Sequence, residues 1–206
     1  MKKQEYYSLR NFYKNKRILI TGATGFKGSW LSFWLFKMGA KVFTTGNNPN
    51  KNKNLFYGLG LEKKTKLSIF DIRNFDRLNK EIKTIKPNII FHLAAQPLIL
   101  KSYIDPKSTY EVNSIGTLNV LESCRNTKSV NSVVCVTSDK CYESNYSTKG
   151  FKETDRLGGK DPYSGSKASA EIIINTYNES FFKNTKQGVA SARAGNVIGG
   201  GDWSRD

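Results

Sequence analysis

The sequence has 206 residues, with 33 lysines and arginines against 17 aspartates and glutamates, and a formal net charge of +16. This length suits one hydrophobic core rather than two. The N-terminus is polar, and the longest apolar stretch, around residues 30–36, contains Ser32 and stops at Lys37. We therefore expect neither a signal peptide nor a membrane span, and a cytoplasmic location with no membrane partner.

The excess of positive charge does not indicate nucleic-acid binding. The lysines are spread through expected turns among asparagines, and they do not gather on one face with aromatic residues. Such a distribution is typical of a solvated surface, so we expect no nucleic-acid partner. The three cysteines, Cys124, Cys135 and Cys141, lack the spacing of metal ligands. The sequence therefore predicts a reduced protein with no metal site.

Apolar strands alternate with helices along the chain. The pattern predicts strands over residues 17–21, 41–45, 66–70, 89–93, 132–137 and 188–193. It predicts helices over residues 26–38, between Asn74 and Pro87, over 108–124, and around Tyr163 and Lys167. On the first of these helices we expect Trp30 and Trp34 to belong to the core face. The alternation predicts an α/β fold, a Rossmann-like doubly wound parallel sheet covered on both faces.

The two ends of the chain lie outside this pattern. We expect residues 1–15 to form an arm packed on the edge of the domain that residues 16–206 form. The irregular stretch 199–206 follows the last expected strand. A site at the carboxyl ends of parallel strands normally needs further chain to close it. We therefore expect that a C-terminal, substrate-binding part is missing.

A glycine-rich turn, residues 21–28, separates the first strand from the first helix. Gly22 suits the tight turn, Gly25 lets the backbone approach a pyrophosphate, and Gly28 lets the helix pack closely on the strand. The spacing G-x-x-G-x-x-G in this context predicts a dinucleotide site. The acidic residue expected at the end of the second strand to bind a ribose is absent, so NAD and NADP both remain open at that point. Asp71 either contacts the adenine or caps the next helix.

A tyrosine and a lysine lie one helical turn apart, at Tyr163 and Lys167. A free phenol is about three pKa units too weak an acid to serve as a base at neutral pH. The Lys167 ammonium on the same helical face would lower the pKa of the Tyr163 phenol. Ser138, at the end of the fifth strand, can hydrogen-bond the reacting oxygen. Together these groups favour redox chemistry on a hydroxyl-bearing substrate.

Several strings resemble the extended short-chain dehydrogenase/reductase superfamily: residues 21–28, 92–96, 113–117 and 163–167. Longer strings resemble the CDP-glucose 4,6-dehydratases within it: residues 25–31, 95–98, 138–143, 158–164 and 193–203. The resemblance covers nearly everything from Lys16 onwards. It implies NAD as the cofactor, CDP-glucose as the substrate and a homodimer formed by helices beginning near Ser108 and Asp161.

The resemblance also implies the residues of the site. Cofactor contacts are expected from Gly22, Thr24, Gly25, Phe26, Lys27, Gly28, Asp71, Ile72, Leu93, Ala94, Ala95, Asn113, Tyr163 and Lys167. Substrate contacts are expected from Gln96, Ser138 and Asn196. Catalytic roles are expected for Ser138, Asp139, Lys140, Tyr163 and Lys167.

Asp139 and Lys140 separate this pattern from that of a simple reductase. Oxidation at C4 of a sugar acidifies the C5 proton, so water can be lost across C5–C6. We assign Asp139 as the acid that protonates the leaving 6-hydroxyl. Lys140 either abstracts the C5 proton as a neutral amine or stabilises the enolate as an ammonium.

Two other functions stay open from the sequence. One is a UDP-hexose 4-epimerase or related reductase, which needs no group to expel the C6 oxygen. The other is a non-catalytic dinucleotide-binding module. His92, the only histidine, is expected to be a packed or backbone-bonded side chain and not a catalytic one.

Overall fold

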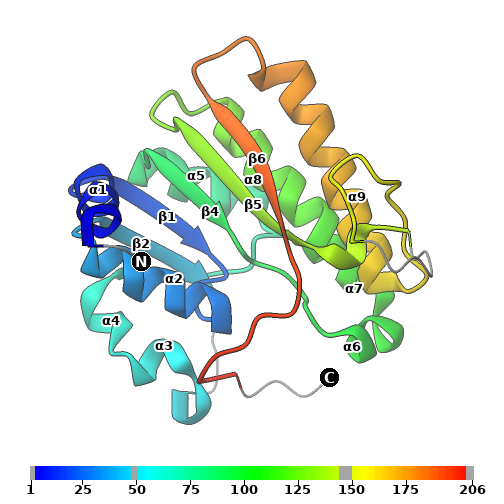
Figure 1. Ribbon diagram of the computed structural model, residues 1–206, viewed down its shortest axis with the longest axis horizontal. Coiled ribbons are helices and arrows are strands. Elements are labelled where there is room, and N and C mark those ends of the chain that lie inside the picture. The colour runs from blue at the N-terminus through cyan, green and yellow to red at the C-terminus, as the bar shows by residue number, and fades with distance from the viewer. Residues whose placement is uncertain (1–2, 48–50, 144–149, 203–206) are drawn as a thin grey trace.

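The structure, a computed structural model, describes residues 3–47, 51–143 and 150–202. A parallel sheet of six strands, in the order β3-β2-β1-β4-β5-β6, forms its centre (Figure 1). The strands are β1 (Arg17–Thr21), β2 (Lys41–Gly46), β3 (Lys66–Ile69), β4 (Ile89–His92), β5 (Ser132–Ser138) and β6 (Gly188–Ala194). The strand order reverses direction between β1 and β4, which confirms the doubly wound fold predicted from the sequence.

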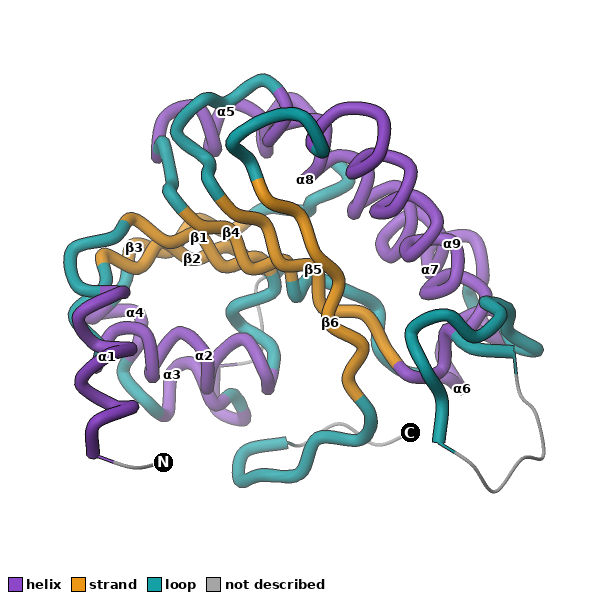
Figure 2. Tube along the Cα trace, turned by 45° about the horizontal axis from the view of Figure 1, so that its top comes forward, coloured by secondary structure: helices purple, strands orange, loops and turns teal. Residues whose placement is uncertain are grey.

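Helices cover both faces of the sheet (Figure 2). On one face lie α1 (Lys3–Tyr13), α2 (Phe26–Lys37), α3 (Leu55–Gly58) and α4 (Leu61–Lys64). On the other lie α5 (Phe75–Ile85), α8 (Gly116–Arg125) and α9 (Pro162–Tyr177), with the short α6 (Ile99–Ile104) and α7 (Pro106–Tyr110) near the carboxyl ends of the strands. Among residues 3–47, 51–143 and 150–202, no helix combines the length and apolar character needed to cross a membrane.

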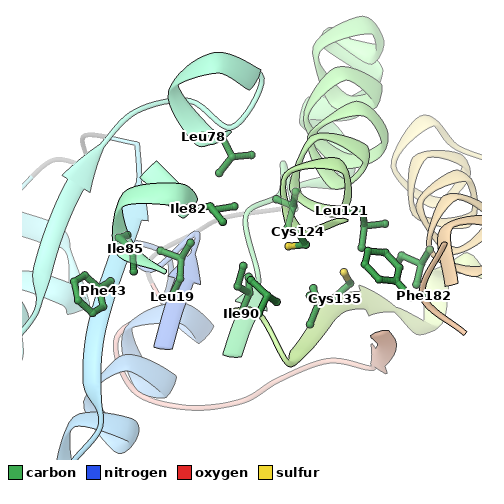
Figure 3. Close-up of a cluster of buried hydrophobic side chains, with 14 residues drawn as sticks. Leu19, Phe43, Leu78, Ile82, Ile85, Ile90, Leu121, Cys124, Cys135 and Phe182 are labelled. Carbon is green, nitrogen blue, oxygen red and sulfur yellow. The ribbon is translucent and has the colours of Figure 1, made fainter. Parts of the chain in front are cut away.

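Two hydrophobic clusters hold these layers together because successive strand residues point to opposite faces. On the α5–α8–α9 face, Leu19 and Ile90 pack with Ile82 and Leu121 (Figure 3). On the α2 face, the alternate residues of β1, Ile18 and Ile20, pack with Leu35, Phe56 and Leu61. The almost uninterrupted apolar character of β1 follows from this burial on both sides.

Side-chain caps place two of the helices. Asn74 begins α5, because its Oδ1 accepts a hydrogen bond from Arg77 N–H at 3.0 Å. Asp161 begins α9, because its Oδ1 accepts from Ser164 N–H at 2.9 Å, and Pro162 occupies the first helical position. The second cap matters for function, since it sets where Tyr163 and Lys167 lie on α9.

Two expectations about helices were wrong in detail. The helix expected over 108–124 is α7 and α8 joined by a π-helical turn, η2 (Glu111–Ile115), which inserts an extra residue into the helical repeat. Trp30 was expected in the core, but it is 42% exposed. The buried residues of α2 are Gly28, Ser29, Ser32 and Leu35, and Trp34, also expected on the core face, packs against the core cluster on this side of the sheet.

Candidate active site

A cavity of about 690 Å³ opens at the carboxyl ends of the strands, around the point where the strand order reverses. Its wall contains the glycine turn after β1, the segments after β2, β3 and β4, the end of β5 and the start of α9. This is the position at which doubly wound sheets bind their ligands.

The glycine turn is shaped to receive a phosphate. Gly22 has a φ of +68°, and a side chain there would meet the Ala94 backbone 2.5 Å away. A side chain at Gly28 would overlap the Gly22 carbonyl, so α2 lies directly against the turn. Gly25 precedes α2 and no side chain caps the helix, which leaves its first N–H groups for an anion. These residues therefore fit the pyrophosphate of a dinucleotide.

Nearly all of the residues expected to contact the cofactor line this one cavity. They are Gly22, Thr24, Gly25, Phe26, Lys27, Gly28, Asp71, Ile72, Leu93, Ala94, Ala95, Tyr163 and Lys167. Further lining residues that the sequence analysis did not single out come from the segments after β2 and β6, among them Asn47, Lys53 and Val197. Asn47 and Lys53 belong to no motif, whereas Val197 lies in the string 193–203, from which the sequence analysis singled out only Asn196.

Asn113 is the exception among the expected cofactor contacts. Its side chain is buried, and it is not among the residues that line the cavity. Its Oδ1 accepts from Gln96 N–H at 2.8 Å, and its Nδ2 donates to Gln96 O at 3.1 Å and to Ser166 Oγ at 2.9 Å. The structure therefore gives Asn113 a supporting position, in which it fixes the loop after β4 against α9.

Gln96, expected to contact substrate, is also absent from the cavity wall. Its side-chain amide binds neighbouring groups: Nε2 donates to Leu98 O at 3.0 Å and to Thr109 Oγ1 at 3.1 Å, and Oε1 accepts from Leu98 N–H at 2.8 Å. A contact between Gln96 and substrate would have to break some of these hydrogen bonds, and it stays a prediction. Asn196 is exposed beside Val197, which does line the cavity.

The sequence left two roles open for Asp71, an adenine contact and the cap of the next helix. Asp71 lines the cavity, but its carboxylate is bound by Arg73, through Nε at 3.0 Å, Nη2 at 2.7 Å and the N–H at 2.9 Å. These hydrogen bonds lower the pKa of Asp71. Asn74, and not Asp71, caps the following helix.

His92 is a buried structural side chain, as expected. Thr117 Oγ1 donates to Asn113 O at 2.6 Å, so it accepts from His92 Nε2, 3.1 Å away. His92 Nδ1 then accepts from Thr21 Oγ1 at 2.7 Å. These partners assign the proton to Nε2. Burial, and next the charge of Lys167, lowers the pKa of His92 to about 3, so the ring stays neutral.

Tyr163 and Lys167 are both buried and both line the cavity. Burial first, and then the charge of Lys27, lowers the pKa of Lys167 to about 8. Burial also lowers the pKa of Lys27, although the Asp139 carboxylate opposes that shift. Lys27 and Lys167 thus both face the cavity, and their positive field favours an anionic ligand.

β5 contributes Val136 and Thr137 to the cavity wall. The next residues, Ser138, Asp139 and Lys140, are not among those that line the cavity. The Ser138 hydroxyl accepts from Lys140 N–H at 3.2 Å and thereby begins the short turn η3 (Asp139–Cys141). Lys140 Nζ lies 3.3 Å from Asp139 Oδ2, and the two side chains are 45% and 38% exposed. Lys140 is therefore a solvent-exposed side chain paired with Asp139.

The sequence did not predict the buried ion pair between Glu171 and Arg193. Glu171, one turn after Lys167 on α9, is bound by Arg193 Nη2 at 2.7 Å and Ser191 Oγ at 2.9 Å, both on β6, and by Thr137 Oγ1 on β5. Arg193 also donates to Tyr142 Oη at 2.8 Å, just after η3. The pair therefore ties α9 to β6, and the Thr137 hydrogen bond ties the same carboxylate to β5, the strand that carries Ser138. Periodicity could have placed Glu171 on the Lys167 face, but its partners are distant in sequence.

The chain after β6 runs back towards α3 (Figure 1). Trp30 Nε1 donates to Gly200 O at 3.0 Å, and Gly201 packs beside Leu55. Val197, Gly201 and Asp202 thereby join the cavity wall. The exposure of Trp30 is explained by this contact.

The cysteines take no part in this chemistry. All three are buried, and burial raises the pKa of Cys135 to about 12 and that of Cys141 to about 11. Their thiols stay protonated and unreactive near neutral pH. Within the described ranges no group of His, Cys, Asp and Glu residues is arranged to hold a metal ion.

Comparison with known proteins agrees with this geometry. Residues 19–197 match the family model described as GDP-mannose 4,6 dehydratase. The chain belongs to this family of extended short-chain dehydrogenases/reductases. Among its curated relatives, it is 45% identical over 202 residues to CDP-glucose 4,6-dehydratase of Salmonella typhimurium, an alignment covering 96% of this chain and 56% of that enzyme. It is 29% identical over 188 residues to CDP-paratose 2-epimerase of Salmonella typhi, covering 82% and 55%.

Solved structures of family members share the fold. Epimerase Mth375 of Methanothermobacter thermautotrophicus superposes with a TM-score of 0.79 at 25% identity, covering 91% of this chain and 54% of that one. UDP-glucose 4-epimerase of Thermus thermophilus, solved with NAD, gives a TM-score of 0.73 at 27% identity, covering 86% and 54%. Members of the family thus bind NAD. The chain spans about half the length of the relatives it matches.

Proposed function

We propose that the protein is a nucleotide-sugar 4,6-dehydratase that converts CDP-glucose to CDP-4-keto-6-deoxyglucose with NAD. The observation that carries this proposal is the position of Asp139 and Lys140 directly after Ser138, beside a cavity that holds Tyr163 and Lys167. The 45% identity to a CDP-glucose 4,6-dehydratase supports the choice of substrate.

In the oxidation step, Tyr163 removes the proton of the sugar 4-hydroxyl. The positive charges of Lys167 and Lys27 stabilise the phenolate that this requires. Ser138 donates a hydrogen bond to the same oxygen. A nicotinamide dinucleotide held by the glycine turn would supply the redox chemistry, as acceptor of the hydride from C4 and its donor to C6.

In the elimination step, water leaves across C5–C6 of the 4-keto sugar. Asp139 protonates the 6-hydroxyl as the C6–O bond breaks, and the C5 proton passes to water. We assign the solvated ammonium of Lys140 to the enolate that forms. To act as this acid, Asp139 first takes up a proton from water, and the bound sugar has to separate it from Lys140.

We also propose that the protein forms a homodimer. Large apolar side chains are exposed on α6, α7, η2 and α9, namely Tyr103, Ile104, Tyr110, Ile115 and Ile172. The helices α6, α7 and α9 pack against one another at one end of the sheet. A two-fold contact would remove this apolar surface from water.

The test of the proposed reaction is direct. The protein is incubated with CDP-glucose and NAD, and the base-labile absorbance of a 4-keto sugar is followed. We expect the chromophore to form without net consumption of NAD. Formation of a CDP-hexose without the chromophore would instead indicate an epimerase, and no change in the sugar would indicate a binding module.

A further inference from the structure

The proposed reaction needs two groups of residues that belong to different elements. Tyr163 and Lys167, which serve the oxidation step, lie on α9. Asp139 and Lys140, which serve the elimination step, lie on the turn η3 after β5. Both groups act on the same bound sugar, and a displacement of about 1 Å in an active site can cost about a hundredfold in rate. The position of η3 relative to α9 therefore has to be fixed.

A chain of hydrogen bonds runs from α9 through Arg193 to the residue after η3. Glu171, which is 3% exposed, lies on α9 one helical turn after Lys167. Its Oε2 accepts from Arg193 Nη2 at 2.7 Å, and Arg193 Nη1 donates to Tyr142 Oη at 2.8 Å. Tyr142 directly follows η3, and its N–H donates to Asp139 O at 3.3 Å. The two arms of one guanidinium thus join the two groups.

Arg193 is itself held in place at the end of β6. In the register of the two strands it lies opposite Thr137, the residue before Ser138. Its side chain is 17% exposed, and Nη1 also donates to Glu153 O at 3.0 Å. Backbone pairing and the partners around the guanidinium together leave it one position between α9 and η3.

A small apolar cluster also joins η3 to α9. Cys141 and Tyr142 pack there with Ala168. Apolar packing is not directional, so it brings the turn and the helix together without setting the orientation of the turn. A planar guanidinium donates in fixed directions, and two of its arms are used here. The orientation of η3 therefore depends on Arg193.

We propose that Arg193 is a positioning residue for the elimination step. It holds η3, with Asp139 and Lys140, against the helix whose residues oxidise the sugar. Its side chain acts through its hydrogen bonds and takes no part in proton transfer. This inference rests on the proposed function for the roles of Asp139 and Lys140. If Arg193 only stabilised the fold, its substitution would lower oxidation and elimination together.

Two substitutions loosen the link to η3. Arg193→Lys keeps the charge that pairs with Glu171, but a single ammonium does not reproduce the two directed arms. Tyr142→Phe leaves that ion pair intact and removes only the hydroxyl on the η3 side. Each variant is mixed with CDP-glucose and NAD in single-turnover experiments. The absorbance of the reduced dinucleotide follows oxidation, and mass spectrometry of quenched samples follows the loss of water.

We expect the loss of water to slow by about tenfold or more in Arg193→Lys, and by about threefold or more in Tyr142→Phe. Oxidation should stay within about twofold of wild type in both, so the reduced dinucleotide should accumulate. A merely stabilising side chain would not produce this spectroscopic signature.

Arg125→Lys and Tyr177→Phe are the matched controls. Arg125 pairs with Glu122 on α8, and Tyr177 Oη donates to the same carboxylate at 3.2 Å. These three residues are not among those that line the cavity. The control variants repeat both chemical changes away from the site and should behave as wild type in both steps.

The outcomes separate this inference from the proposed function. Selective slowing of water loss in Arg193→Lys supports it. Equal slowing of both steps, or unchanged rates, overturns it and leaves the proposed dehydratase standing. If Arg193→Lys does not fold, Tyr142→Phe, which leaves no charge unpaired, decides by the same criterion. A wild-type protein that forms no 4-keto-6-deoxy product overturns the proposed function and this inference with it.

Discussion

In the proposed reaction, Tyr163 acts in the oxidation step and Asp139 acts in the elimination step. Tyr163→Phe should abolish every step, because no base remains for the 4-hydroxyl. Asp139→Asn should leave oxidation at C4 partly intact but slow the loss of water by about 10²–10⁴. The reduced dinucleotide should then accumulate, visible by its absorbance, without release of the 6-deoxy product.

Asp76→Asn, a change at an exposed residue of α5, is the matched control for the loss of a carboxylate and should behave as wild type. If Asp139→Asn lost oxidation and elimination equally, with normal folding and cofactor content, the division of roles would be wrong. Asp139 would then serve only to shape the turn after β5.

Substitutions of Lys140 distinguish a side chain that accepts the C5 proton from one that only provides a positive charge. Arginine keeps the positive charge but does not deprotonate in proteins. Because Lys140 is 45% exposed and paired with Asp139, we expect Lys140→Arg to retain much of the elimination rate and Lys140→Met to lose most of it. Single-turnover kinetics on both variants measures this. Equal loss in the two variants would make Lys140 the base at C5.

Lys167 should make stability depend on pH. Its pKa is about 8 in the folded protein against 10.5 for a free side chain, so the unfolded chain binds more protons between these values. Stability should therefore rise with pH across that window, and the destabilisation by the buried charge should be complete below about pH 8. Lys167→Met should raise the free energy of unfolding near neutral pH by about 1–3 kcal/mol.

Urea denaturation of wild type and Lys167→Met at about pH 7 and about pH 9.5 checks this. The stability difference between the two proteins should shrink at the higher pH. A difference that stays constant would show that the charge on Lys167 is not the cause.

The residue patterns single out side chains that the structure brings to one cavity wall, together with two that it does not. Gly22, Tyr163 and Lys167 belong to local motifs, and each lies on the cavity wall. Gln96 and Asn113 belong to similar motifs, but their side chains bind partners that the fold brings from elsewhere, at Thr109 and Ser166. Spacing along the chain does not reveal such partners.

At the scale of elements, the contact between α2 and the glycine turn decides whether the phosphate site exists. A Cβ at Gly28 would overlap the Gly22 carbonyl, so Gly28→Ala should displace α2. We expect a loss of about 1–3 kcal/mol in stability and a marked weakening of dinucleotide binding. Thermal melts with and without NAD measure both effects.

Gly58→Ala is the control, because Gly58 is helical and has open space around its Cβ position. That variant should be neutral or slightly more stable, since alanine reduces the freedom of the unfolded chain. Normal NAD binding by Gly28→Ala would contradict the close packing of α2 on the turn.

The strands were predictable because burial on both faces demands apolar runs, as in β1 and β4. The π-helical turn between α7 and α8 was not predictable, because the side chains of residues 108–124 fit an uninterrupted α-helix. The π-helical turn is favoured by contacts outside that segment: Asn113 and Ser114 on this turn both hydrogen-bond Ser166 on α9. A pattern within one helix carries no information about such a contact.

At the scale of the whole molecule, the exposed apolar side chains of α6 and α9 should lie in the dimer contact. Ile104→Lys with Ile172→Lys should convert the dimer to monomers, because two charges would be buried without partners. Light scattering at micromolar concentration measures the mass. Ile198→Lys, on the segment after β6, also replaces an exposed isoleucine and should leave the dimer intact. A wild-type protein that is monomeric would refute the dimer.

The central claim is that one hydride leaves C4 of the sugar and returns at C6 after water is lost. CDP-glucose carrying deuterium at C4 tests it most directly, with NAD present and the product examined by mass spectrometry and NMR. We expect a 4-keto-6-deoxy sugar with the deuterium in the C6 methyl group. Deuterium retained at C4 of a hexose, or lost to a free pool of reduced dinucleotide, would contradict the assignment as a 4,6-dehydratase.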